Sequence, residues 1–235
     1  MALLTATPDI QRSPLGATEN DAFVLAPNGL YPLWENNGLI ITHRHGVLTS
    51  SVAQFGILDR IHIGTRPTSL AMRVPNMHLK ALIYRWPTVS LASELGVYIL
   101  LPGAKESFFS PRYTSRLGNI DNTVTVLPLN VAVTWHPKPW VALHATLTCM
   151  TILGDAPVKN EAVIGGFIAT EFLAWKYHAL SVHIGEIGMW NHDQWIVGGS
   201  YRFHYQWFDA RFGYFMRHSP EGLQTNPMFQ VGLLL

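Results

Sequence analysis

Residues 195–207 read W-I-V-G-G-S-Y-R-F-H-Y-Q-W, and this stretch decides the fold. One set of alternate positions is apolar or aromatic and runs from Trp195 to Trp207, while the other set carries Arg202 and His204. Alternation with a period of two predicts a β-strand with two unlike faces. The stretch is about twice the usual strand length. It therefore fits a strand that crosses a bilayer obliquely, with lipid on one face and a wet lumen on the other.

The length of this stretch matches the thickness of a membrane. Thirteen residues at roughly 3.3 Å each give about 43 Å. With a tilt near 40°, this length covers roughly 33 Å, enough for an apolar band and its two interfaces. Trp195 and Trp207 then mark those interfaces.

The composition supports a membrane barrel. Charged residues make up 13% of the 235 residues, against roughly 25% in soluble proteins. Hydrophobic residues make up an ordinary 48%, so the chain lacks charge rather than polarity. A barrel whose strands are half apolar and half polar predicts this combination. The net charge of +1 gives no indication of a nucleic-acid partner.

The chain divides into an irregular segment, 1–37, and a transmembrane antiparallel up-and-down β-barrel, 38–235. Residues 1–37 contain four Pro and no sustained period, so we expect them on the periplasmic side or tucked into the lumen. Residues 1–20 show no secretory signal, and we expect that such a signal has been removed. No apolar run is long enough for a transmembrane helix.

The alternation predicts an all-β chain of twelve strands, with ten as the alternative. The first two expected strands could be one interrupted strand. The expected strands are 38–46, 49–58, 61–67, 77–86, 88–101, 122–135, 140–153, 161–174, 177–189, 195–207, 209–217 and 227–235. Longer connections are expected at 68–76, 102–121, 154–160, 190–194 and 218–226. Short periplasmic turns that alternate with longer extracellular loops are typical of outer-membrane barrels.

Tryptophan follows the expected strand ends. Five of the eight Trp residues lie at short connections and two flank a loop at the opposite end. Aromatic residues at both interfaces form the girdles of membrane barrels. The predicted girdle residues are Trp86, Trp135, Trp140, Trp175, Trp190, Trp195 and Trp207.

Two segments, taken together, resemble a pattern found in other proteins. Residues 52–65 read V-A-Q-F-G-I-L-D-R-I-H-I-G-T, and residues 74–83 read V-P-N-M-H-L-K-A-L-I. They resemble the recurring hairpin and P-N-x-x-hydrophobic-K segment of small uncharacterised, porin-like bacterial outer-membrane β-barrels. Here Phe55 replaces the usual Tyr and Leu58 the usual Thr. The resemblance implies fold and location, and it implies no activity.

The C-terminal strand partly fits the same class. Outer-membrane barrels usually end in an aromatic residue that the insertion machinery reads, and this chain ends in Leu235. Phe229, Val231 and Leu233 share its face.

A set of polar side chains is expected to face the lumen. The candidate lumen-lining residues are Lys80, Glu94, Asn130, His144, Glu171, His183, Arg202, His204, Arg211 and Arg217, with His62 and Arg66 on the same faces. Two acids against five bases predict a mildly basic interior. Since buried lumen charges need partners, Glu171 or Glu94 with Arg202 or Arg211 are the expected ion pairs. The alternative to a pore is an interior filled by paired side chains.

The sequence gives few indications of a metal site or a catalytic site. His43 and His45 share a strand face without a third ligand, so no metal and no cofactor is expected. A Ser–His pair of the H-x-S type is absent; the nearest patterns are Ser181-Val182-His183 and His144-Ala145-Thr146. Loop 191–193, Asn-His-Asp, has one acid where a protease site needs two. The single cysteine, Cys149, excludes an intrachain disulfide and reads as a small lipid-facing residue.

Three functions are consistent with these patterns. The first is a narrow porin-like channel in a bacterial outer membrane, surrounded by lipid and lipopolysaccharide and inserted by the barrel-assembly machinery. The second is a non-conducting structural or scaffold barrel that binds a protein or lipid. The third, favoured least, is a lipid-modifying enzyme.

Overall fold

The computed structural model describes residues 46–234, apart from 50–52, 59, 72, 105–121, 139, 155–160, 176, 188–194, 206–207 and 220–221. The expectations for residues 1–37 and for most of strand 38–46 lie outside the described residues. Among the described residues, no helix is both long enough and apolar enough to cross a membrane.

The described residues form β-strands and one short helix. The strands are β1 (Gly46–Thr49), β2 (Ala53–Leu58), β3 (Ile61–Thr65), β4 (Asn76–Arg85), β5 (Val89–Leu100), β6 (Val124–Lys138), β7 (Val141–Gly154), β8 (Glu161–Trp175), β9 (His178–Ile187), β10 (Trp195–Tyr205), β11 (Phe208–Ser219) and β12 (Gly222–Leu234), and the helix is α1 (Pro67–Ala71). The all-β, antiparallel, up-and-down architecture predicted from the alternation is therefore present.

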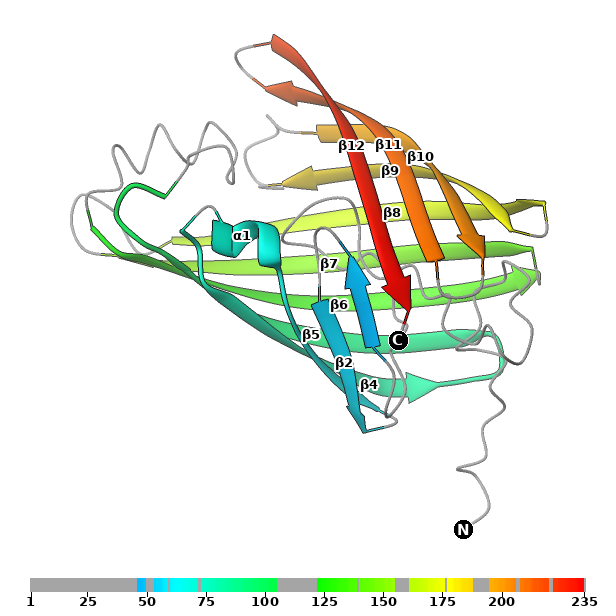
Figure 1. The fold of residues 1–235 in the computed structure, drawn as a ribbon, viewed down its shortest axis with the longest axis horizontal. Coiled ribbons are helices and arrows are strands. Elements are labelled where there is room, and N and C mark those ends of the chain that lie inside the picture. The colour runs from blue at the N-terminus through cyan, green and yellow to red at the C-terminus, as the bar shows by residue number, and fades with distance from the viewer. Residues whose placement is uncertain are drawn as a thin grey trace.

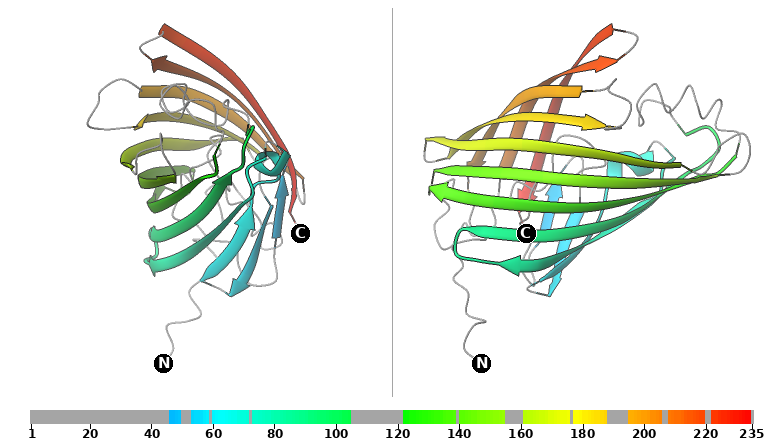
Figure 2. Two further views of the ribbon diagram at one scale, coloured as in Figure 1. Left: turned by 90° about the vertical axis from the view of Figure 1, so that its left-hand side faces the viewer. Right: turned by 180° about the vertical axis from the view of Figure 1, so that it is seen from behind.

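Each strand pairs with its neighbours in sequence, and β1 also pairs with β12, so that the order of pairing returns to its start (Figure 1). The side views in Figure 2 show the long strands curving around one interior. The contact that joins the first strand to the last is short. It involves Val47, Leu48 and Thr49 on β1 and residues 232–234 on β12.

The two ends of the strands differ. We call the end where β4–β5, β6–β7, β8–β9 and β10–β11 are joined the turn end, because these connections are short. The opposite end, where β5–β6, β7–β8 and β9–β10 are joined, is the loop end. This distinction follows the predicted alternation of short and long connections.

Several predicted boundaries are wrong. The long connection expected at 218–226 is absent, because β11 extends to Ser219 and β12 starts at Gly222, its register partner. Gly222 has φ 114°, a conformation that glycine adopts without strain, so the chain reverses tightly there. Residues 47 and 48, expected between strands, lie in β1, and the connection expected at 68–76 contains residues 68–71 of α1 and the first residue of β4. β3 ends at Thr65, two residues before the predicted end of that strand.

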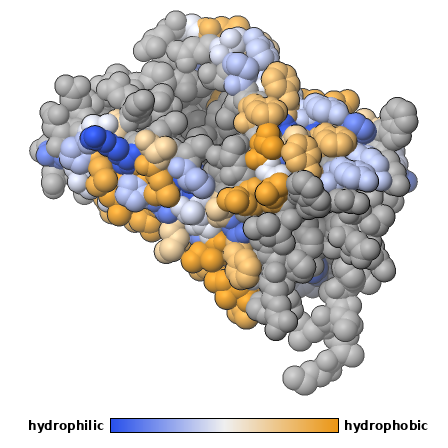
Figure 3. Space-filling view, in the orientation of Figure 1, coloured by the Kyte–Doolittle hydropathy of each residue, from blue (hydrophilic) through white to orange (hydrophobic). Residues whose placement is uncertain are grey.

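Burial alternates along the long strands as the sequence predicts. In β6 the outward residues Leu129 and Val131 are 46% and 38% exposed, whereas the inward Asn130 is 1% exposed. The same pattern is present in β5 and β7. Apolar side chains therefore form the outer wall, and Figure 3 shows them over β2 and β4.

Glycines on the inner face make room for aromatic rings. A Cβ atom at Gly185 would lie 2.1 Å from Cδ1 of Phe167, and one at Gly198 would lie 2.4 Å from Cδ1 of Phe215. Each glycine is the register partner of its phenylalanine on the neighbouring strand, because side chains on one face of a sheet meet across strands.

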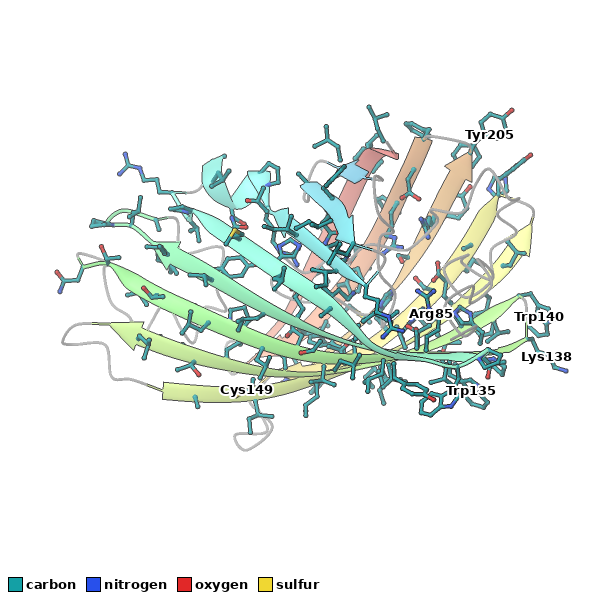
Figure 4. The ribbon with its side chains drawn as sticks, turned by 90° about the horizontal axis from the view of Figure 1, so that it is seen from below. Arg85, Trp135, Lys138, Trp140, Cys149 and Tyr205 are labelled. Atoms are coloured by element: carbon teal, nitrogen blue, oxygen red, sulfur yellow. The ribbon has the colours of Figure 1, made fainter. Side chains whose placement is uncertain are left out.

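The predicted girdle residues lie at both ends where they are described. Trp86, Trp135 and Trp140 at the turn end are 51%, 47% and 52% exposed, and Trp195 at the loop end is 41% exposed. Figure 4 labels Trp135 and Trp140 at the turn end. Trp175 is the last residue of β8, while Trp190 and Trp207 lie outside the described residues. A membrane-interface role for these residues stays a prediction.

Candidate functional site

A band of polar side chains crosses the inner face from β2 to β11. We call it the polar belt; its members are Gln54, His78, Lys80, Glu94, Asn130, Thr134, His144, Glu171, Arg202, Asp209 and Arg211. Each is at most 5% exposed. They share one side of the sheet because each lies at an inward position of an alternating strand.

On strands β2 to β6 the belt is built from cross-strand neighbours. Gln54 Nε2 lies 2.9 Å from His78 Nε2, and the contact passes over Gly64, where a Cβ atom would lie 2.4 Å from that His78 nitrogen. Lys80 and Glu94 are register partners on β4 and β5. Asn130 Nδ2 donates a hydrogen bond to Glu94 Oε1 at 3.4 Å.

On strands β6 to β11 the belt continues as a chain of polar contacts. A hydrogen bond of 2.8 Å joins Thr134 Oγ1 and His144 Nδ1, and His144 Nε2 lies 3.4 Å from Glu171 Oε2. Arg202 connects two carboxylates. Its Nη1 lies 3.7 Å from Glu171 Oε1, and its Nε donates to Asp209 Oδ2 at 2.6 Å.

The charges of the belt balance. Lys80, Arg202 and Arg211 oppose Glu94, Glu171 and Asp209, and Arg211 is the register partner of Arg202 on β11. Removing a charge from water costs several kcal/mol, on the order of the attraction that a well-placed partner returns. Interleaved charges of opposite sign therefore allow the belt to be buried at all.

A second hydrogen-bonded group lies beside the belt on β9 and β10. Ser181 Oγ lies 2.8 Å from His183 Nε2 and 2.5 Å from Ser200 Oγ. The first distance brings a hydroxyl within reach of a base, as nucleophilic catalysis requires. The Ser181 hydroxyl is also shared with Ser200, so the group forms one network of two hydroxyls and an imidazole.

A further inward cation lies nearer the loop end. Arg66, which follows β3, is 1% exposed, and its Nε donates to Tyr98 Oη at 2.7 Å. His62 is 2% exposed, and its ring lies 6.3 Å from that of His78.

The predicted lumen residues fall inside wherever their side chains are described. Lys80, Glu94, Asn130, His144, Glu171, His183, Arg202 and Arg211 are 7% exposed or less. The side chains of His204 on β10 and Arg217 on β11 lie outside the description. That these residues line a path for solutes stays a prediction.

The expected ion pair between Glu171 and Arg202 is confirmed. Glu94 differs, because the structure places it beside Lys80 and Asn130 rather than beside an arginine. Asp209, Gln54 and His78 were missed as inward polar residues. Asp209 could have been found, since it lies two positions before Arg211 and shares its strand face.

Other candidate sites are not assembled. The described part of the chain contains no group of three or more His, Cys, Asp or Glu residues that could hold a metal ion. His43, His45 and the loop 191–193 lie outside the described residues. Cys149 is a free cysteine of intermediate exposure on β7, and it lies on the outer side of the strand (Figure 4).

The solved structures that are similar to this chain include two outer-membrane proteins. The outer-membrane expressed OmpT of Vibrio cholerae matches with a TM-score of 0.44 and 9% identity over 78% of this chain, which spans 63% of that one. The COG4313 outer membrane channel from Pseudomonas putida F1 matches with a TM-score of 0.39 and 8% identity over 85% of this chain and 97% of that one. No protein-family model and no curated protein sequence matches the chain.

Proposed function

We propose that this protein is a closed, twelve-stranded transmembrane β-barrel of a bacterial outer membrane, and that it is a narrow porin-like channel for small polar solutes. The observation that supports this proposal is the polar belt, which lies inside a wall of outward apolar side chains. Lipid and lipopolysaccharide would surround this wall, with the turn end in the periplasm as in other barrels of this kind.

The interior of such a channel would be mildly basic. Four cations, Arg66, Lys80, Arg202 and Arg211, and three carboxylates are buried among the described residues. The sequence suggested five cations and two carboxylates; Asp209 adds a carboxylate, and the side chain of Arg217 lies outside the described residues. A near balance of charge predicts weak discrimination between anions and cations.

Solute uptake into proteoliposomes tests the proposal. The protein is reconstituted, and a panel of small charged and uncharged solutes is tested against vesicles without protein. We expect faster entry of at least one solute. If no solute enters while the folded protein still shows heat-modifiable migration, the channel proposal is wrong.

One observation favours a second function. The belt residues are at most 5% exposed, and their mutual contacts resemble those of small barrels whose interiors are filled by side chains. A non-conducting scaffold barrel that binds a protein or lipid is therefore the alternative. A complex that survives mild detergent extraction, together with absent solute entry, would support it.

A further inference from the structure

Ser181 and His183 face the interior from the same strand. They lie two positions apart on β9, and side chains at this spacing share one face of a strand. Leu180 and Val182, at the alternate positions, are 49% and 57% exposed on the outer wall. Ser181 Oγ lies 2.8 Å from His183 Nε2, so the hydroxyl can donate a hydrogen bond to the imidazole. The pair therefore has the geometry of a serine nucleophile and its general base.

The members of this hydrogen-bonded group differ in exposure. His183 is 7% exposed and Ser200 is 6% exposed, and the ring of His183 lies 5.5 Å from that of Phe215. Ser181, in contrast, is only partly buried. The more accessible of the two serines is therefore the one that contacts the base most closely.

Ser200 supports the Ser181 hydroxyl from the neighbouring strand. It is the register partner of Ser181 on β10, and the two hydroxyl oxygens lie 2.5 Å apart. When the Ser181 hydroxyl donates to His183, the proton between the two serines comes from Ser200. A donor aimed at Ser181 Oγ stabilises the negative charge that develops there as its own proton leaves.

Charged groups lie on both sides of the two serines. Glu171 is the register partner of Ser181 on β8, and Arg202 follows Ser200 by two positions on the same face of β10. The 3.7 Å contact between Arg202 Nη1 and Glu171 Oε1 spans the inner face of β9, where the small residue Ala179 adjoins Ser181. A fixed guanidinium beside the serines favours the oxyanion that forms when a carbonyl is attacked.

We propose that Ser181 is the nucleophile, and His183 the general base, of a site that hydrolyses small acyl esters inside the barrel. Because the pair faces away from the outer wall, its substrate is a solute of the interior rather than a membrane lipid. This activity goes beyond the proposed channel function and does not depend on it.

The reaction has two steps, which share one base. Ser181 Oγ bonds to the acyl carbon as its proton passes to His183 Nε2; the ester C–O bond then breaks, and the leaving alcohol takes that proton. In the second step water attacks the acyl carbon and gives a proton to His183. The bond to Ser181 Oγ breaks, the acyl group leaves as a carboxylic acid, and His183 returns the proton to Ser181.

Covalent labelling of the full, folded chain in detergent micelles tests the proposal. A fluorophosphonate probe reacts with activated serines, and peptide mass spectrometry locates the adduct. We expect the adduct on Ser181, and we expect it to abolish turnover of p-nitrophenyl acetate. An unmodified Ser181 in the folded protein would overturn the inference, whatever the outcome of the solute-uptake experiment. An adduct on Ser181 without any ester turnover would overturn the hydrolytic activity.

Variants test the role of the base. His183→Gln should slow the labelling of Ser181 on the order of a hundredfold, since general bases contribute about 10²–10⁴-fold. Equal labelling rates would show that His183 is not the base. The control, Ser90→Ala, removes another inward serine, 1% exposed, whose register partners are Arg85 and Thr134; it should leave labelling and turnover unchanged. Heat-modifiable migration shows which variants fold, and the position of the adduct in the unaltered protein decides the proposal if a variant does not.

Discussion

Arg202 is a buried cation of the belt that contacts two carboxylates. It is 2% exposed and lies against both Asp209 and Glu171. The alternation around Trp195 predicted its inward orientation, and charge pairing predicted Glu171 as a partner. The stronger contact, with Asp209, was not predicted, although residue 209 begins the expected strand 209–217 and shares the strand face of Arg211.

Arg202→Ala should destabilise the folded protein. It leaves two buried carboxylates without this cation, and breaking a buried pair typically costs about 3–5 kcal/mol. Urea unfolding in lipid vesicles, followed by tryptophan fluorescence, measures the loss. Lys138→Ala, which removes an exposed cation, should change the free energy of unfolding by less than about 0.5 kcal/mol. Equal effects of the two substitutions would show that Arg202 is not held by its carboxylates.

Elements differ in how well the sequence defines them. The long strands β5 to β8 were predicted closely because their alternation is sustained over many residues and a shift of one residue would invert both faces. The short strands β1 to β3 were predicted poorly. Four to six residues contain too few periods to fix a boundary, and glycine and proline near 220 conceal the start of β12.

The join between β1 and β12 should be the least stable part of the wall. β1 has three register pairs with β12 and three with β2, whereas β12 pairs with β11 from Phe208 to Ser219. We expect β1 amides to exchange with deuterium on the order of tenfold faster than those of β7. Hydrogen-exchange mass spectrometry in nanodiscs measures this difference. Equal protection of β1 and β7 would show that the join is as stable as the rest of the wall.

Over the described residues, large apolar side chains lie on the outside and the polar belt lies on the inside, which differs from the arrangement of a soluble protein. This distribution could be predicted from composition and alternation together, because low charge without high hydrophobicity fits a two-faced wall. The path of the polar contacts could not be predicted. It depends on which residues of neighbouring strands become register partners, and a single sequence does not define that register.

The lone cysteine offers a test of how the molecule lies in the bilayer. Cys149 lies within β7 between Leu129 and Ile164, its register partners. A spin label on Cys149 should be reached by oxygen and protected from a water-soluble nickel reagent. The control moves the thiol inward, as Thr148→Cys with Cys149→Ser, since Thr148 is fully buried. Ready access of the nickel reagent to a label on Cys149 would contradict a lipid-facing outer wall.

The seating of Phe215 over Gly198 also limits how this protein can evolve. A methyl group at position 198 and a phenyl ring at position 215 compete for the same volume, since the Cβ atom would lie 2.4 Å from the ring. Among related sequences the two positions should therefore change together, with a larger residue at 198 accompanied by a smaller one at 215. The same linkage should join positions 185 and 167, so that these residues are inherited as pairs.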